Sequence, residues 1–580
     1  MKKLARSAAA GAAAVATITA LGGAAASAAP PASSTTGTTG TIDITGTNGT
    51  TTAGHPAKAP AISWSACDNP RLRAAKAQCG LLSVPLDHAR PAGTKIQIAV
   101  SRIKATAAPA KRQGPLLLNP GGPGGSGLTL PLYLAATLPK DVAASYDLVG
   151  FDPRGVGASK PALSCDKNLN AGPRPDYVPA AATAAAPLGS NETAWLARSK
   201  AYADACAKAA PTLLPHLTTV ETVKDMDVLR QALGAAKINY YGFSYGTYLG
   251  QVYATMFPDR VRRLVFDGNV DPSNVWYNAQ LDQDKAFEGA MHEFFTWVAA
   301  HDEVYGLGAT AADVLSTYHA TQDKLRAKAV GKVGPAEWTD VFLPAGYAQS
   351  LWPDIAGAFA RWQRGETKPV ADLWDDAAEV GDDNGFAMYA GVQCVDAVWP
   401  LDYRTWRADG FATAARAPFE TWGNVWFNTP CMFWHAPQGV PPVVDGSKAP
   451  AALLVNTTLD GATPYSGALE VRRRFPHAAL VAEAGSTTHA DSLGGNSCVD
   501  GAVFSYLRSG ALPARKAGAG ADLTCTASPL PVPNPADVAD AGTLLTRSIA
   551  DPRSLAGGIL SPTARAERFG LVTMWSRTRG

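Results

Sequence analysis

The 580-residue sequence predicts an α/β fold, a mainly parallel β-sheet with helices on both faces. Short apolar runs alternate with helical patterns such as residues 223–233, and this alternation is typical of β-α-β units. Several of the runs lead into loops of small or reactive residues, at the sheet edge where parallel sheets build their sites. The predicted strands are residues 95–103, 115–119, 146–151, 238–242, 263–267, 451–456 and 478–482.

A long insertion interrupts this alternation. About 180 residues separate the strand that ends at Asp267 from the next one, whereas a parallel crossover needs about a dozen residues plus a helix. The excess predicts a large, mostly helical cap inserted before the strand at 451–456. Its many tryptophans either pack the cap itself or line a substrate pocket. The predicted division is a core over residues 61–275 and 446–530, a cap over 276–445, and a tail over 531–580 without an assigned role.

The N-terminal residues have the pattern of a secretory signal peptide. A basic start precedes an alanine-rich apolar stretch and the small-residue sequence Ala26-Ser27-Ala28, so residues 1–28 are predicted to be removed on export. Residues 29–60 are mainly Thr, Gly, Ser, Ala and Pro, which predicts a disordered pro-segment or spacer. No other stretch is long and apolar enough to span a membrane. We therefore expect a secreted, extracellular protein.

The charge balance narrows the classes of partner. Lys plus Arg number 51 and Asp plus Glu number 49. This near balance argues against a nucleic-acid partner and against a polybasic membrane contact. We expect a monomer.

The sequence Gly242-Phe243-Ser244-Tyr245-Gly246 follows a predicted strand and precedes a helical pattern. Glycines on both sides of a serine allow the sharp strand-to-helix turn, a nucleophile elbow, that presents the hydroxyl for attack. The alternative is an inert serine in a glycine-rich turn. The strand and helix context favours the elbow, which is typical of the α/β-hydrolase fold.

A nucleophilic serine needs a general base and a carboxylate that orients it, and in α/β-hydrolases the acid and then the histidine follow the serine in the chain. Asp460 follows the first of the last two predicted strands, and His489 follows the second. We therefore predict that they meet at one edge of the sheet. Asp267 and Asp271 remain competing acids. His477 lies before a strand rather than after one, and we expect it at the surface.

A loop of small residues follows the strand at 115–119, from Asn119 to Gly127. Its backbone N–H groups can approach a substrate closely. We predict an oxyanion hole made by the N–H of Tyr245, which follows the nucleophile, and the N–H of Gly121 or Gly122. A flexible linker or a phosphate cradle is the alternative, but the loop lacks the Lys-Ser/Thr ending of a P-loop.

Several motifs together resemble the exported tripeptidyl aminopeptidases of actinobacteria, which are related to the prolyl aminopeptidases. The resemblance covers roughly residues 60–530. It implies an α/β-hydrolase fold, a triad of Ser244, Asp460 and His489, and a peptidase activity on free N-termini. Pro120 stands where prolyl aminopeptidases have a histidine, as in the tripeptidyl branch. The motifs are Asn119-Pro120-Gly121-Gly122-Pro123-Gly124, the stretch 146–159, Gly242-Phe243-Ser244-Tyr245-Gly246-Thr247, the stretch 264–272, and Asp460-Gly461-Ala462-Thr463-Pro464, with Cys431-Met432-Phe433-Trp434 between the last two.

Eight cysteines in an exported chain predict disulfides rather than a metal site, since no C-x-x-C or H-E-x-x-H pattern is present. We expect neither a metal nor a cofactor. Eight cysteines allow about 105 pairings, and the residues alone do not choose among them. The family resemblance and the short loops favour pairing of neighbours: Cys67–Cys79, Cys165–Cys206, Cys394–Cys431 and Cys498–Cys525.

Two function classes stay open. The first is a serine exopeptidase that releases short peptides, tripeptides above all, from substrates with a free N-terminus; the second is a secreted carboxylesterase or amidase of the same fold. A binding protein built on an inactive hydrolase is disfavoured because nucleophile, acid, base and oxyanion loop are all present. An aminopeptidase must bind an α-ammonium, which calls for a carboxylate. We predict Asp396 for this role, although a residue at this place could also cap a turn.

Overall fold

The computed structural model describes residues 61–378 and 380–533, which belong to the second of two compact units, residues 58–580. The predicted signal peptide, the predicted spacer up to residue 60 and residues 534–580 of the predicted tail lie outside the described residues. A ten-stranded sheet forms the centre, in the order β1-β2-β3-β5-β4-β6-β7-β8-β9-β10. The strands are β1 Ser65–Ala66, β2 Gln78–Pro85, β3 Lys95–Ile103, β4 Gly114–Asn119, β5 Tyr146–Phe151, β6 Ile238–Phe243, β7 Val261–Asp267, β8 Ala452–Thr457, β9 Ala479–Ala484 and β10 Leu523–Thr526.

The sheet confirms the predicted fold class. Strands β1, β2, β3 and β5 pair antiparallel in succession, and all pairs from β5 to β10 are parallel. Each predicted strand is present with its ends shifted by two residues or fewer. Strands β1, β2 and β10 were not predicted: β2 contains Gly80 and is only partly buried over its first half, and β1 and β10 are very short.

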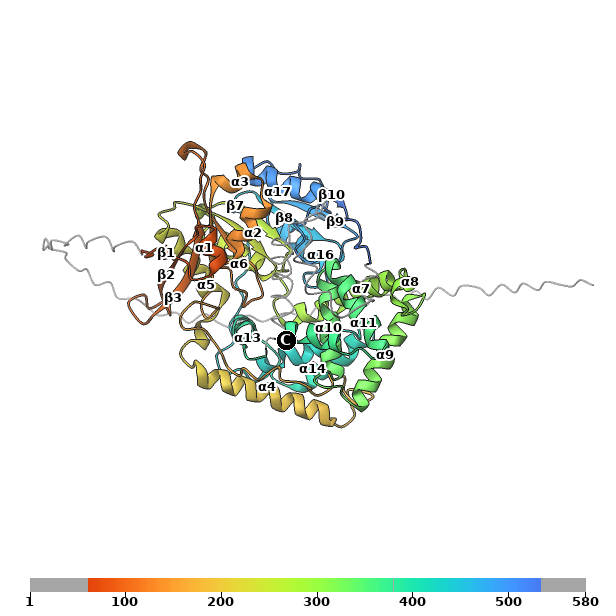
Figure 1. Ribbon diagram of the computed structural model, residues 1–580. Helices are drawn as coiled ribbons and strands as arrows, with labels where there is room; N and C mark the ends of the chain where they lie inside the picture. The colour runs from red at the N-terminus through yellow and green to blue at the C-terminus, as the bar shows by residue number, and fades with distance from the viewer. Residues whose placement is uncertain (1–60, 379, 534–580) are drawn as a thin grey trace, which may run out of the picture. The chain divides into compact units, whose positions relative to one another are not determined.

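Helices cover both faces of the sheet (Figure 1). Successive side chains of a strand point to opposite faces, and in β6 Tyr240 packs into one hydrophobic core and Tyr241 into the other. The first core contains α5 Thr219–Ala232, α6 Tyr245–Met256 and α16 Tyr465–Arg474. The second contains α2 Leu130–Thr137, α3 Lys140–Ser145 and α17 Ser497–Ser509.

Between β7 and β8 the chain forms a helical layer, as the excess length predicts. Its aromatic side chains are mostly buried among one another and extend both hydrophobic cores. The helices are α7 Tyr277–Ala299, α8 Asp302–Tyr305, α9 Ala311–Ala327, α10 Pro335–Tyr347, α11 Trp352–Gln363, α12 Lys368–Ala378, α13 Asn384–Asp396, α14 Tyr403–Ala414 and α15 Thr421–Asn428, with 3₁₀ turns η4 Gln349–Leu351 and η5 Thr429–Phe433.

A second insertion, residues 160–218, lies between β5 and α5 and was not predicted. It carries α4 Ser190–Ala209 along the margin of the helical layer (Figure 1). Two buried ion pairs join it to that layer, Arg407–Glu192 at 2.7 Å and Arg174–Glu337 at 2.8 Å. The helical layer therefore contains two separate chain segments. The long connection before α4 is rich in Ala, Pro and Gly and has no apolar periodicity, which explains why the sequence gives little sign of it.

The four predicted disulfides are confirmed, and no cysteine is free in the part of the chain that the structure describes. Cys394–Cys431 joins α13 to η5 inside the helical layer. Cys498–Cys525 joins α17 to β10. The other two bridges are Cys67–Cys79 and Cys165–Cys206.

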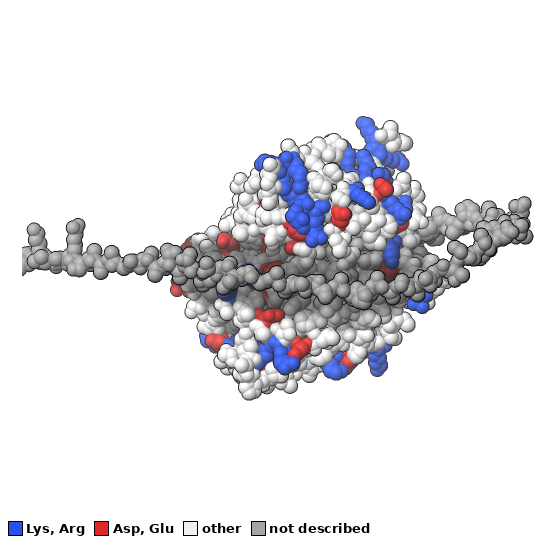
Figure 2. Space-filling view, turned by 180° about the vertical axis from the view of Figure 1, so that it is seen from behind, with Lys and Arg blue, Asp and Glu red and all other residues white. Residues whose placement is uncertain are grey.

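Within the described ranges, no helix is long and apolar enough to cross a membrane. The face shown in Figure 2 carries basic and acidic side chains dispersed among uncharged residues.

Candidate active site

Ser244 stands at the apex of the turn between β6 and α6, with φ 54° and ψ −124°. A positive φ is costly for a residue with a side chain and is typical of nucleophile elbows. The flanking glycines are required by close approach: a Cβ on Gly242 would lie 2.4 Å from the carbonyl oxygen of Gly246, and one on Gly246 would lie 2.8 Å from that of Asn119. The Ser244 N–H donates to the backbone oxygen of Asp267 at 2.8 Å, which fixes the turn to β7.

Asp460 and His489, placed at the ends of β8 and β9, come into direct contact. His489 Nδ1 lies 2.7 Å from Oδ2 and 2.9 Å from Oδ1 of Asp460, and both residues are buried. The carboxylate is held in turn by the N–H groups of Ala462 at 2.9 Å and Thr463 at 2.8 Å, and by the Thr463 hydroxyl at 2.8 Å. This arrangement places the proton on Nδ1 and leaves Nε2 to act as the base.

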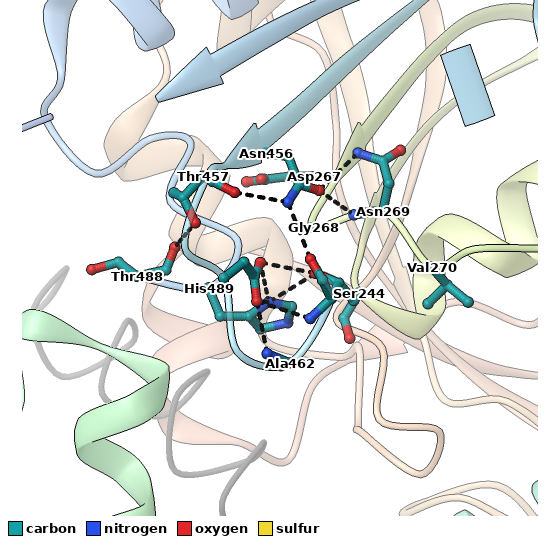
Figure 3. A network of polar contacts seen from close by, with 12 residues as sticks. Ser244, Asp267, Gly268, Asn269, Val270, Asn456, Thr457, Ala462, Thr488 and His489 are labelled. Carbon is teal, nitrogen blue, oxygen red and sulfur yellow. Dashed lines mark hydrogen bonds and ion pairs between the residues drawn. The ribbon is translucent and has the colours of Figure 1, made fainter. Parts of the chain in front are cut away.

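The His489 ring lies beside Ser244 (Figure 3). Gly268 lies next to His489 and Ser244. A Cβ on Gly268 would lie 2.8 Å from His489 Cε1. The residue before it, Asp267, accepts the hydrogen bond from the Ser244 N–H through its backbone oxygen. The structure thus brings together the serine, the histidine and the acid that the sequence singled out.

The helical layer also holds the histidine loop. The His489 N–H donates to the carbonyl oxygen of Tyr347, at the end of α10, at 2.8 Å. The Gln349 N–H donates to the Thr488 hydroxyl at 3.3 Å. The Tyr347 ring packs edge-on against the imidazole, with ring centroids 5.9 Å apart. These contacts fix the histidine loop from the side opposite to the sheet, and the sequence held no signal for them.

The competing residues have other partners. Oδ2 of Asp267 accepts hydrogen bonds from the Ser492 N–H at 2.9 Å and from the Ser492 hydroxyl, so this acid anchors the loop that follows His489. Burial raises the pKa of the Asp267 carboxyl to about 7. His477 is exposed in the turn before β9, as expected. Asp271 lies in a cavity, described below.

The glycine-rich loop approaches the elbow closely. Gly121 has φ +97°, and a Cβ there would lie 2.5 Å from the carbonyl oxygen of Phe243 and 3.1 Å from the backbone nitrogen of Tyr245. Only glycine fits at this place. The Gly121 N–H donates to Asn119 Oδ1 at 2.9 Å, whereas Gly122 lines the cavity together with Ser244 and Tyr245.

A cavity opens at Ser244, between the sheet edge and the helical layer, and its empty volume, open solvent included, is about 770 Å³. Among the tryptophans of the helical layer, Trp276 lines it, whereas most of the others are buried in the cores. The cavity is lined by Gly122, Ser244, Tyr245, Asn269, Val270, Asp271, Asn274, Trp276, Ala279, Gln280, Asp282, Gln283, Tyr347, Tyr389, Gln393, Ala462, Thr463, Pro464, Ser466 and Gly467.

Asp396 is not among these residues. Its carboxylate lies at the first turn of α5, where it accepts hydrogen bonds from the N–H of Thr219 at 2.7 Å and from the hydroxyl of the same residue at 2.5 Å. Burial raises the pKa of Asp396 to about 6. The Thr219 hydroxyl also contacts the Tyr245 hydroxyl at 2.7 Å. The structure therefore brings Asp396 to a helix cap behind Tyr245 and does not bring it into the cavity.

The comparisons with known proteins agree with this geometry. Residues 114–489 match the model of the alpha/beta hydrolase fold family. The chain is 40% identical to a tripeptidyl aminopeptidase of Streptomyces coelicolor over 81% of its own length and 87% of that protein. It is 33% identical to the serine protease Hip1 of Mycobacterium tuberculosis over 78% of its length and 89% of that protein. It is also 33% identical to carboxylesterase B of the same species, over 80% of its length and 90% of that protein.

The family model matches more than half of the chain, and the relative at 40% identity covers 81% of it. The chain belongs to the α/β-hydrolase family and, within it, to the group that contains the Streptomyces tripeptidyl aminopeptidases.

Proposed function

We propose that the protein is a secreted serine exopeptidase that releases short peptides, tripeptides above all, from the free N-terminus of peptide substrates. The observation that carries this proposal is the His489–Asp460 pair, 2.7 Å apart and buried, beside a serine held at positive φ at the end of a cavity. The similarity to tripeptidyl aminopeptidases over most of the chain supports the peptide substrate.

In the proposed mechanism Ser244 Oγ attacks the scissile carbonyl carbon while His489 Nε2 takes its proton. Asp460 stabilises the imidazolium that forms. When the tetrahedral intermediate collapses, His489 gives the proton to the leaving amine, and the shortened peptide departs. A water molecule, activated by the same base, then hydrolyses the acyl-enzyme and releases the short N-terminal peptide.

For the oxyanion we assign the N–H groups of Tyr245 and Gly122. Tyr245 begins α6, so its N–H belongs to the unpaired first turn of a helix. Gly121 is less suitable because its N–H already donates to Asn119 Oδ1. A single donor of this kind contributes about 3–4 kcal/mol to transition-state stabilisation.

Export is part of the proposal. The signal-peptide pattern of residues 1–28 and four disulfides support it, because disulfides persist in oxidising compartments. The substrates would accordingly be extracellular peptides. We further propose that residues 276–445 act as a cap that limits access to the site to short chain ends.

A carboxylesterase is the second candidate, favoured by the relative of that name. Three substrates separate the two: a tripeptide p-nitroanilide with a free N-terminus, its N-acetylated copy, and p-nitrophenyl acetate. The proposal predicts that the enzyme cleaves the free tripeptide p-nitroanilide efficiently and its N-acetylated copy poorly. It also predicts that the Ser244→Ala variant turns over neither. A fluorophosphonate that labels another serine would contradict the assignment of the nucleophile, and esters cleaved far better than free tripeptides would favour the esterase.

A further inference from the structure

The cavity at Ser244 has the charge of a cation site. Two carboxylates line it, those of Asp271 and Asp282, and no Lys or Arg is among the described residues that do so. A ligand that enters it with a positive charge would be stabilised, and one with a carboxylate at that place would be repelled.

Asp282 already has partners. Its Oδ2 accepts a hydrogen bond from Asn274 Nδ2 at 2.7 Å, and its Oδ1 lies 3.0 Å from Lys285 Nζ. Its side chain is 49% exposed. Water and Lys285 therefore compensate this charge before any substrate arrives.

Asp271 is different. Its Oδ1 accepts hydrogen bonds from the Ser273 N–H at 2.8 Å and from the Ser273 hydroxyl at 2.6 Å. Its Oδ2 has no hydrogen-bond or ion-pair partner among the described residues. The charge of Asp271 reaches the guanidinium of Arg473 only through space, and that group is paired with Glu470 at 2.6 Å. Asp271 thus lines the cavity as a half-buried acid, with one carboxylate oxygen that no described residue binds.

The position of Asp271 is tied to the nucleophile. The Val270 N–H donates to the Thr247 hydroxyl at 3.0 Å, and that hydroxyl donates to the Ser244 carbonyl oxygen at 2.6 Å. On its other side, a Cβ on Gly467 would lie 3.0 Å from the Asp271 nitrogen. The acid therefore keeps a fixed place relative to the reacting serine (Figure 3 shows Val270 next to this site).

A second group in the same cavity points to the same ligand. Gln280 is 8% exposed, and its Oε1 is buried without a hydrogen-bond partner among the described residues. Its Nε2 donates to Gln393 Oε1 at 3.1 Å. A buried acceptor without a donor is unfavourable by about 1–3 kcal/mol, and an N–H of a bound ligand would remove that cost.

We propose that Asp271 is the residue that binds the α-ammonium of the substrate, with Gln280 Oε1 accepting an N–H group of the same peptide end. The inference rests on the proposed exopeptidase function and assigns to Asp271 the role expected from the sequence for Asp396. Asp271 acts as a specificity-determining residue: it holds the free N-terminus and thereby selects short N-terminal segments for cleavage.

The test is a cycle between one substitution and one change in the substrate. Asp271→Asn keeps an oxygen for Ser273 and removes the charge. Asp282→Asn is the comparison variant, because it removes the other carboxylate of the cavity. The substrates are a free tripeptide p-nitroanilide and its des-amino analogue, in which hydrogen replaces the ammonium group.

With the free substrate, Asp271→Asn should lower kcat/KM by about 10–100-fold, mainly through KM, since a charge-assisted hydrogen bond is lost. With the des-amino substrate the parent enzyme should already have a low kcat/KM, and Asp271→Asn should change that kcat/KM by less than about threefold. On the free substrate, Asp282→Asn should lower kcat/KM clearly less than Asp271→Asn does, because water and Lys285 already compensate the charge of Asp282. Asp271→Ser, which keeps a short acceptor near Ser273, provides a second variant if Asp271→Asn does not fold.

Equal losses on both substrates, or a larger loss for Asp282→Asn, would overturn the assignment of Asp271. If the parent enzyme cleaves the free and the N-acetylated tripeptide equally well, the exopeptidase function itself fails. The two failures are distinguishable because the second appears in the parent enzyme and needs no variant.

Discussion

Replacing Asp460 with asparagine changes one atom of the pair that orients His489. The amide oxygen can still accept from the N–H groups of Ala462 and Thr463, which bind Oδ1 at 2.9 and 2.8 Å. The NH₂ group takes the place of Oδ2, the atom that lies 2.7 Å from His489 Nδ1. Two donors cannot face each other, so the imidazole must move its proton to Nε2, the nitrogen that should accept the serine proton.

The wrong tautomer leaves Ser244 without a base. A loss of this kind lowers kcat by about 10⁴, or about 5 kcal/mol in activation free energy. The fold should persist, because the other hydrogen bonds of Asp460 remain possible. The assay is kcat on a free tripeptide p-nitroanilide at equal concentrations of folded enzyme, with the melting temperature as a check on folding.

Asp267→Asn is the matched control, since this second buried acid contacts Ser492 and not His489. We expect it to keep kcat within about tenfold of the parent. An Asp460→Asn enzyme that retains more than about a tenth of the parent kcat, or a larger catalytic loss for Asp267→Asn, would refute the reasoning.

Three further predictions concern stability and the oxyanion loop. Burial raises the pKa of Asp267 from 3.8 to about 7, so its contribution to the free energy of unfolding is fully present below about pH 4 and is lost as the pH rises through 7. Denaturant titrations at pH 4, 6 and 8 should show that the free energy of unfolding falls with pH by up to about 4 kcal/mol less in Asp267→Asn than in the parent. The same fall with pH in both proteins would contradict the prediction. Gly121→Ala should lower kcat by about 10²–10³ with little change in KM, because the added Cβ would displace the loop from Phe243. Gly114→Ala is the control: Gly114 also has a positive φ but has open space around it, so kcat should not change. Equal losses of kcat in the two variants would mean that the effect is general backbone strain. Removing the Cys394–Cys431 bridge with two serines should destabilise the helical layer by about 2–4 kcal/mol, measured as a lower melting temperature than the parent, and an unchanged melting temperature would show that the bridge does not stabilise the native state.

The sequence predicts the sheet and the meeting of Ser244, Asp460 and His489 at one sheet edge for a physical reason. Buried parallel strands are continuous apolar runs, and the reactive residues follow them directly at the same edge. Ser244, Asp460 and His489 could therefore be found one strand at a time. The disulfide pairing followed from the family resemblance and from local spacing, and all four bridges form as predicted.

The cavity is harder to predict, because its walls come from segments that meet only in three dimensions. Gln280 of α7 and Gln393 of α13 touch across 113 positions of sequence, and Tyr347 reaches the histidine loop from α10. Asp396 was predicted to line the cavity, and its true partner could not be predicted for the same reason. It is the last residue of the apolar helix α13 and lies two residues after the disulfide-bonded Cys394. Its carboxylate binds the first turn of α5, at a residue 177 positions away in the sequence.

The most direct test of the central claim is to identify the products made from a peptide of about ten residues with a free N-terminus and from its N-acetylated copy. Mass spectrometry should show a released tripeptide and the remaining fragment from the free peptide, no cleavage of the acetylated one, and no products with Ser244→Ala. Cleavage inside the acetylated peptide, or products formed by the Ser244→Ala enzyme, would contradict the account.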